Sequence, residues 1–177
     1  MNHRNDRQSF AAKAVNVLLW TAQILWGLFF SFTGFGKVLA YDPAVWHQFL
    51  RQVAWFSAVP QDLFIFIGVC EGLGGVALIV PAMTHVAPKL TPIAAAGLTI
   101  IMILAVGFHI ARAEYHWFLP VNLIIGGVAA LIAYGRFVLP IQPKPVGAFR
   151  MVTGLAVFGM LVVAGFVPVW YQMAHLH

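Results

Sequence analysis

The sequence consists mainly of long apolar runs, separated by short stretches that contain polar residues and prolines. Each run has roughly twenty residues, enough for a helix with a rise of about 1.5 Å per residue to cross a hydrocarbon core of ~30 Å. Helix breakers predict loops at Pro60, at 81–92 and at 142–145. The pattern predicts an all-α fold, a polytopic transmembrane helical bundle. Its spans are expected at 14–36, 63–82, 92–113, 117–134 and 151–168.

A different pattern follows the first predicted span. Asp42 is a typical helix cap, and Pro43 suits the first position of the helix that it would start. Beyond them, apolar residues recur in helical rhythm among polar ones, which is typical of an amphipathic helix at the membrane interface. A lid over a cavity is the alternative role that the pattern leaves open. The apolar positions are Val45, Trp46, Phe49, Leu50 and Val53, and the polar ones are His47, Gln48, Arg51 and Gln52.

Composition excludes a water-soluble globule. Of the 177 residues, 62% are hydrophobic and 8% are charged, whereas an ordinary soluble domain has about 25% charged residues. The lipid bilayer is therefore expected to surround nearly the whole chain. The net charge of +5 does not indicate a nucleic-acid partner, because the basic residues lie between apolar runs and form no patch. The single cysteine, Cys70, excludes an intramolecular disulfide and a CxxC redox pair.

The basic residues instead predict how the chain crosses the membrane, because cytoplasmic flanks carry more Lys and Arg. With the N-terminus inside, seven basic residues face the cytoplasm and three face the other side. An odd number of spans then places the C-terminus outside, and a bacterial plasma (inner) membrane is the expected location. The cytoplasmic set is Arg4, Arg7, Lys13, Lys89, Arg136, Lys144 and Arg150, and the opposite set is Lys37, Arg51 and Arg112.

A small set of polar side chains lies in or at the ends of the predicted spans. An ionisable group inside a span costs about 2.5–3.5 kcal/mol on insertion scales, so such groups normally face the bundle interior and have partners. Counting residues at about 1.5 Å each puts Glu71 ~12 Å below the outer end of the second span. The same count places the whole set in the outer half of the membrane. The set is Lys37, Glu71, His109, Arg112 and Asn122.

Small residues on the same helical faces indicate that these side chains point inward. Glu71 shares a face with two glycines, and Asn122 shares a face with a glycine and two alanines; such residues mark packed helix contacts in membranes. We therefore expect Glu71, His109 and Asn122 to contact one another in one enclosed pocket. A network that only holds the bundle together is the alternative, and Lys37 and Arg112 have the further alternative of extending to the interface.

Several segments together resemble the DoxX-like family of small integral membrane proteins. They are LFFSFTGFGK at 28–37, CEGLGGVALIVP at 70–81, AAAGLTIIMILAVGFHIARAE at 94–114 and AYGRF at 133–137. The resemblance implies a four-helix bundle, so the fifth span is a departure from the family, and it implies that Lys37, Glu71, His109 and Asn122 match polar positions of the family's helices. The expected layout is one membrane domain over 1–177, with a cytoplasmic segment at 1–13, a DoxX-like four-helix core at 14–137, a loop at 138–150, and the fifth span and tail at 151–177.

The resemblance also implies a link to membrane redox systems, because some DoxX-like proteins are named for a subunit of a thiosulfate:quinone oxidoreductase. We therefore expect Glu71, His109, Asn122, Lys37 and Arg112 to bind a small amphipathic ligand such as a quinone, whose oxygens can exchange protons with imidazole and carboxyl groups. A non-enzymatic anchor or accessory subunit of an oxidoreductase complex is the alternative. A homo-oligomer is left open, as are catalysis and the residues that would carry it.

No intrinsic cofactor or metal is expected. A haem with two histidine ligands needs two facing intramembrane histidines, and only His109 is so placed. A metal bound by His109 and Glu71 would need a third ligand, for which Asn122 is poorly suited. Transport of protons or solutes is less well supported than ligand binding, because the polar set occupies only one half of the membrane.

Overall fold

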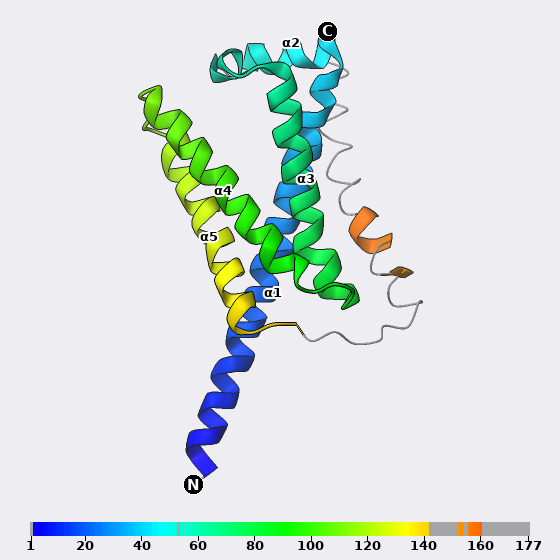
Figure 1. Cartoon of the computed structure of the whole chain (residues 1–177), viewed down its shortest axis with the longest axis vertical. Coiled ribbons are helices and arrows are strands. Elements are labelled where there is room, and N and C mark those ends of the chain that lie inside the picture. The colour runs from blue at the N-terminus through cyan, green and yellow to red at the C-terminus, as the bar shows by residue number, and fades with distance from the viewer. Residues whose placement is uncertain (1, 53, 142–151, 154–155, 161–177) are drawn as a thin grey trace.

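Every regular element in the computed structural model is a helix, and the model describes residues 2–52, 54–141, 152–153 and 156–160. Two short 3₁₀ helices, η1 (Leu39–Tyr41) and η2 (Ala54–Ala58), flank the helix that follows the first span. The all-α prediction is thus confirmed for the described residues (Figure 1). The α-helices are α1 (Asn2–Val38), α2 (Pro43–Gln52), α3 (Gln61–Thr84), α4 (Leu90–Ala111) and α5 (Phe118–Val138).

Helices α1, α3, α4 and α5 are long and apolar enough to cross a membrane, which confirms the first four predicted spans. The membrane-length part of the first lies at Phe10–Tyr41, while α1 itself begins at Asn2 and projects beyond the other helices (Figure 1). Most of the fifth predicted span, 151–168, lies outside the described residues, so that span remains a prediction.

The loop predicted at 81–92 begins later than expected, so the first part of this prediction is wrong. Helix α3 continues through Pro81 to Thr84 and ends at His85, whose φ is 58°. Proline is tolerated inside membrane helices because neighbouring helices and polar side chains re-satisfy the freed backbone groups. The loop before α4 is therefore confined to residues 85–89.

Helices α1 and α3 pack closely because glycines line their contact. A Cβ atom built on Gly34 would lie 2.2 Å from the Gly72 backbone nitrogen, and one on Gly75 would lie 2.4 Å from the Ser31 nitrogen. Neither position has room for a side chain. Such close backbone contacts at small residues are common where membrane helices pack. On α3, Gly68, Glu71 and Gly75 are all buried, which confirms the predicted small-residue face.

The bundle consists of two antiparallel pairs, α1 with α3 and α4 with α5. The α4–α5 pair leans away from the α1–α3 pair toward the end that carries α2 (Figure 1). We call this the α2 end, and the opposite end, where α3 and α5 finish and α4 begins, the N-terminal end. The two pairs share a buried core of Phe30, Leu78, Ile79, Ala95, Leu98, Met102, Ala129, Ile132 and Ala133.

The predicted amphipathic helix is present as α2. The Asp42 Oδ1 atom accepts a hydrogen bond from the Ala44 N–H at 2.8 Å, so Asp42 caps the helix as expected and Pro43 is its first residue. The apolar face of α2 packs on the start of α3: the Phe49 and Phe64 ring centroids are 5.4 Å apart. The position of α2 at a membrane interface remains a prediction.

Candidate functional site: polar clusters at both ends of the bundle

Lys37 and Glu71 form an ion pair between α1 and α3 at the α2 end. Lys37 is in the last turn of α1, and Glu71 lies ten residues into α3. The side chain of Glu71 is 3% exposed, whereas that of Lys37 is 23% exposed. A buried carboxylate therefore has a partly accessible counter-charge beside it.

The glycine face of α3 also makes room for this pair. A Cβ atom on Gly68 would lie 2.7 Å from the Cβ atom of Lys37. The absence of a side chain at 68 thus lets the Lys37 stem run along α3 toward Glu71. The sequence folds locally in this way because small residues let membrane helices approach closely.

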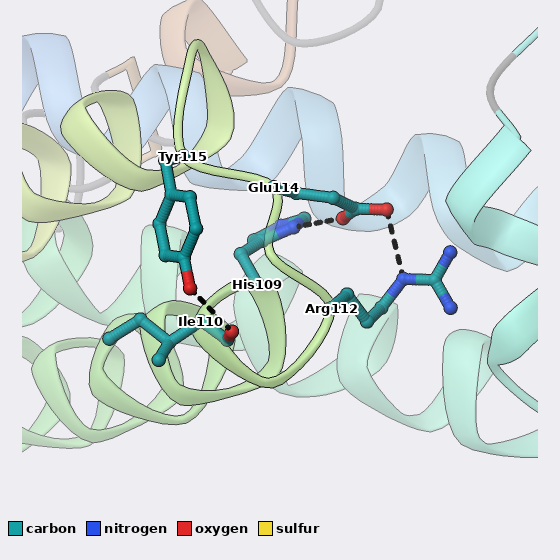
Figure 2. A network of polar contacts seen from close by, with 5 residues as sticks. All are labelled: His109, Ile110, Arg112, Glu114 and Tyr115. Carbon is teal, nitrogen blue, oxygen red and sulfur yellow. Dashed lines mark hydrogen bonds and ion pairs between the residues drawn. The ribbon is translucent and has the colours of Figure 1, made fainter.

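His109, Glu114 and Arg112 form a second polar cluster, where α4 ends and the chain turns toward α5. Figure 2 shows Glu114 between the other two side chains. The His109 Nδ1 and Glu114 Oε2 atoms are 2.7 Å apart, and Arg112 Nε donates to Glu114 Oε1 at 2.9 Å. Ala113 has a left-handed φ of 58°, and the Glu114 N–H donates to the His109 carbonyl at 3.0 Å. This turn brings the carboxylate back against the histidine.

Aromatic rings enclose His109, whose exposure is only 3%. Its imidazole stacks on the Phe118 ring with centroids 4.9 Å apart and an interplanar angle of 9°. The Arg112 guanidinium carbon lies 5.5 Å from the centroid of the Phe108 ring, in a cation–π arrangement. The imidazole is thereby fixed in orientation by one carboxylate and one stacked ring.

The polar partners hold Glu114 in its ionised form. The hydrogen bond with His109 is the main cause that lowers the pKa of Glu114 below its ordinary value of 4.5, and desolvation opposes it. The hydrogen bond with Arg112 and the positive charges nearby lower the pKa further. A carboxylate at this position can therefore stay charged through the neutral range and keep orienting the imidazole.

The structure gives Glu71 and His109 different partners from those expected. Glu71 pairs with Lys37, and His109 and Arg112 both pair with Glu114, so the predicted set is divided between two helix pairs. Asn122 lies partly buried on α5, on a face with the buried Gly126, and no hydrogen bond of its side chain is found within the described part of the chain. Glu114 was missed because it lies in a loop rather than in a span.

A further polar cluster lies at the N-terminal end and was also missed. Arg136, expected as a flanking topology signal, is only 2% exposed. Its Nε atom donates to Gln23 Oε1, and its Nη1 atom donates to Asn16 Oδ1 at 2.6 Å. The Gln23 amide in turn donates to the Leu78 carbonyl at 2.8 Å. The available signal was the spacing of seven between Asn16 and Gln23, which puts both on one face of an apolar helix.

Among the residues that the structure describes, no group of three His, Cys, Asp or Glu side chains could hold a metal ion. The groups described at the α2 end are two carboxylates, an imidazole and two cations, which can form hydrogen bonds and ion pairs.

Comparison with known proteins gives one match. The model of the DoxX-like family matches residues 21–133, which is more than half of the chain and includes Lys37, Glu71, His109 and Asn122. No curated protein and no solved structure matches the chain.

Proposed function

The chain belongs to the DoxX-like family, and from that membership we propose that it is an integral membrane protein whose α2 end binds a small amphipathic ligand such as a quinone, as part of a membrane redox system. The observation that carries the proposal is the presence of two polar clusters at the same end of the bundle, each with one buried ionisable side chain: Glu71 with Lys37, and His109 with Glu114 and Arg112.

The energetic cost of Glu71, which is buried within α3, argues for more than a structural role. Interhelical polar contacts in membranes are worth on average only about 0.6 kcal/mol, whereas an intramembrane charge costs about 2.5–3.5 kcal/mol to insert. Apolar packing would join the helices at lower cost, so the presence of a charged residue at position 71 favours a site that uses it.

The groups have suitable chemistry for a ligand that carries carbonyl or hydroxyl oxygens. Lys37 is partly exposed and donates hydrogen bonds, and the imidazole of His109, which Glu114 orients, has ring nitrogens that can donate or accept a hydrogen bond. The α4–α5 pair leans away from the α1–α3 pair toward this end (Figure 1), and the proposed ligand would enter from the surrounding lipid. Asn122 and Arg112 belong to the proposed binding set.

Photo-crosslinking with a quinone analogue tests the proposal. We expect Glu71→Gln and His109→Ala together to reduce labelling of the full chain about tenfold, the size expected for losing a hydrogen bond with a charged group. The matched control, Asp62→Asn with His116→Ala, removes the same two chemical groups from exposed positions and should label like the wild type. Labelling unaffected by the first pair of substitutions contradicts the proposal.

A non-enzymatic accessory subunit is the second candidate. It is favoured by the mutual pairing of the charged groups and by the projection of α1 beyond the bundle (Figure 1). Purification in mild detergent separates the two functions: a stoichiometric oxidoreductase partner that stays bound supports the subunit role. A monodisperse chain that crosslinks the quinone analogue alone supports ligand binding.

A further inference from the structure

Arg136 is a buried cation without an acidic partner in the described part of the chain. The ion pairs found there join Lys37 with Glu71, and Glu114 with His109 and Arg112; none includes Arg136. Its neighbours are uncharged: Asn16, Gln23 and the Trp20 ring, whose centroid lies 5.3 Å from the guanidinium carbon. A buried charge without compensation is strongly unfavourable, so this position favours an anion.

One donor of this guanidinium is also unused. The Nε and Nη1 atoms of Arg136 are bonded to Gln23 and Asn16, while Nη2 is buried and has no hydrogen-bond partner among the described residues. Leaving a charged donor buried and unsatisfied costs more than leaving a neutral one. The missing partner is therefore expected to be an acceptor, and an anionic oxygen satisfies both the charge and the donor.

Arg136 lines a cavity of about 380 Å³ at the N-terminal end, between the start of α4 and the end of α5. Lys89, an exposed residue just before α4, lines the same cavity and adds a second positive charge. The remaining lining is apolar and comes from Pro88, Pro92, Ile93, Phe137, Pro140 and Ile141. The cavity therefore places an accessible space and a second cation beside the residue that carries the unpaired donor.

We propose that this cavity binds the phosphate of an anionic phospholipid, with Arg136 and Lys89 as its ligands. Guanidinium and ammonium groups together are a typical phosphate-binding set. Two features favour a lipid over free phosphate: the cavity lies where membrane-length helices begin and end, and its rim carries the exposed apolar side chains of Ile93 and Phe137. These side chains can contact the acyl chains while the cations hold the headgroup.

Lipid binding by the full chain in detergent micelles tests the site. We expect phosphatidylglycerol to bind about tenfold more tightly than phosphatidylcholine, since the site provides two cations. Lys89→Glu should abolish most of this preference, and Arg136→Gln should abolish it as well. The control Arg51→Glu makes the same kind of charge reversal on exposed α2, at the other end of the bundle, and should keep the preference.

Each outcome decides the proposal. Equal binding of the two lipids by the wild type overturns it, and so does a preference that survives Lys89→Glu. Because Lys89 is exposed, that variant remains informative even where Arg136→Gln does not fold. Inorganic phosphate serves as the competitor: displacement of phosphatidylglycerol at equimolar phosphate overturns the lipid assignment, whereas no displacement supports it. Quinone crosslinking at the α2 end does not depend on any of these results.

Discussion

The two members of the Lys37–Glu71 pair differ in how they respond to losing their partner. Glu71 is buried, so without Lys37 its carboxylate would be left charged and uncompensated in a low-dielectric interior. Lys37 is partly exposed, and without a charged Glu71 its long side chain can extend toward the membrane surface. The pair is therefore expected to be energetically asymmetric.

The asymmetry predicts that Lys37→Met destabilises the fold more than Glu71→Gln does. We expect about 2–3 kcal/mol for the first, somewhat less than for breaking a fully buried pair, and about 1 kcal/mol for the second. Unfolding in mixed micelles measures the loss of unfolding free energy for each variant. The double variant should lose less than the sum of the two single losses. Equal destabilisation by the two variants would contradict this asymmetry, because it would mean that Lys37 gains nothing from its partial exposure when Glu71 is neutralised.

The lowered pKa of Glu114 predicts how its cluster responds to acid. A carboxyl group whose pKa is lower in the folded state adds stability above its ordinary pKa, and that stability is lost as the pH falls through the folded pKa. We therefore expect the cluster to persist from neutral pH down to about 4.5 and to be lost below it. Infrared difference spectra against Glu114→Gln report the protonation of this one carboxyl.

A companion variant isolates the cause of that shift. The hydrogen bond with His109 is the largest contribution, so His109→Ala should raise the pKa of Glu114 more than Arg112→Ala does. The reverse order would show that the guanidinium, rather than the imidazole, holds the carboxylate.

At the scale of elements, close approach of α1 and α3 depends on glycines that have no room for a side chain. A Cβ atom on Gly34 would meet backbone atoms of α3, which cannot move aside as a flexible side chain can. We expect Gly34→Ala to destabilise the bundle by about 2–3 kcal/mol, at the upper end for overpacking, and to weaken the Lys37–Glu71 pair one turn away.

The same helix provides a matched control. A Cβ atom on Gly36 would have nothing within 4 Å, so Gly36→Ala should be neutral or stabilising by up to about 1 kcal/mol through helix propensity. Unfolding measurements on the two variants compare one added methyl group with and without an opposing backbone. Similar costs at both positions would contradict the packing role assigned to Gly34.

At the scale of the whole molecule, the distribution of basic residues predicts a cytoplasmic N-terminal end and an external α2 end. In a Cys70→Ala background, a membrane-impermeant maleimide added outside intact cells should label Gln52→Cys in α2. It should label Val86→Cys, in the loop before α4, only after permeabilisation. Both sites are exposed in the structure, so the opposite pattern would reverse the predicted orientation.

The sequence alone determined the four described spans, the capped helix after the first span and the glycine face around Glu71. These features depend on the hydropathy and spacing of neighbouring residues, and a helix repeats its faces at a known interval. The sequence also predicted the burial of Glu71 and His109, because an ionisable group that faces lipid is energetically costly.

Only the tertiary structure decided which side chains meet. Glu114 reaches His109 because the backbone turns at Ala113, and Arg136 reaches Asn16 and Gln23 because the end of α5 lies beside the middle of α1. Residues more than a hundred positions apart share no periodic signal, so their pairing depends on how the helices are arranged. Physically, hydropathy fixes how deep a residue lies in the membrane, whereas helix packing selects its partner.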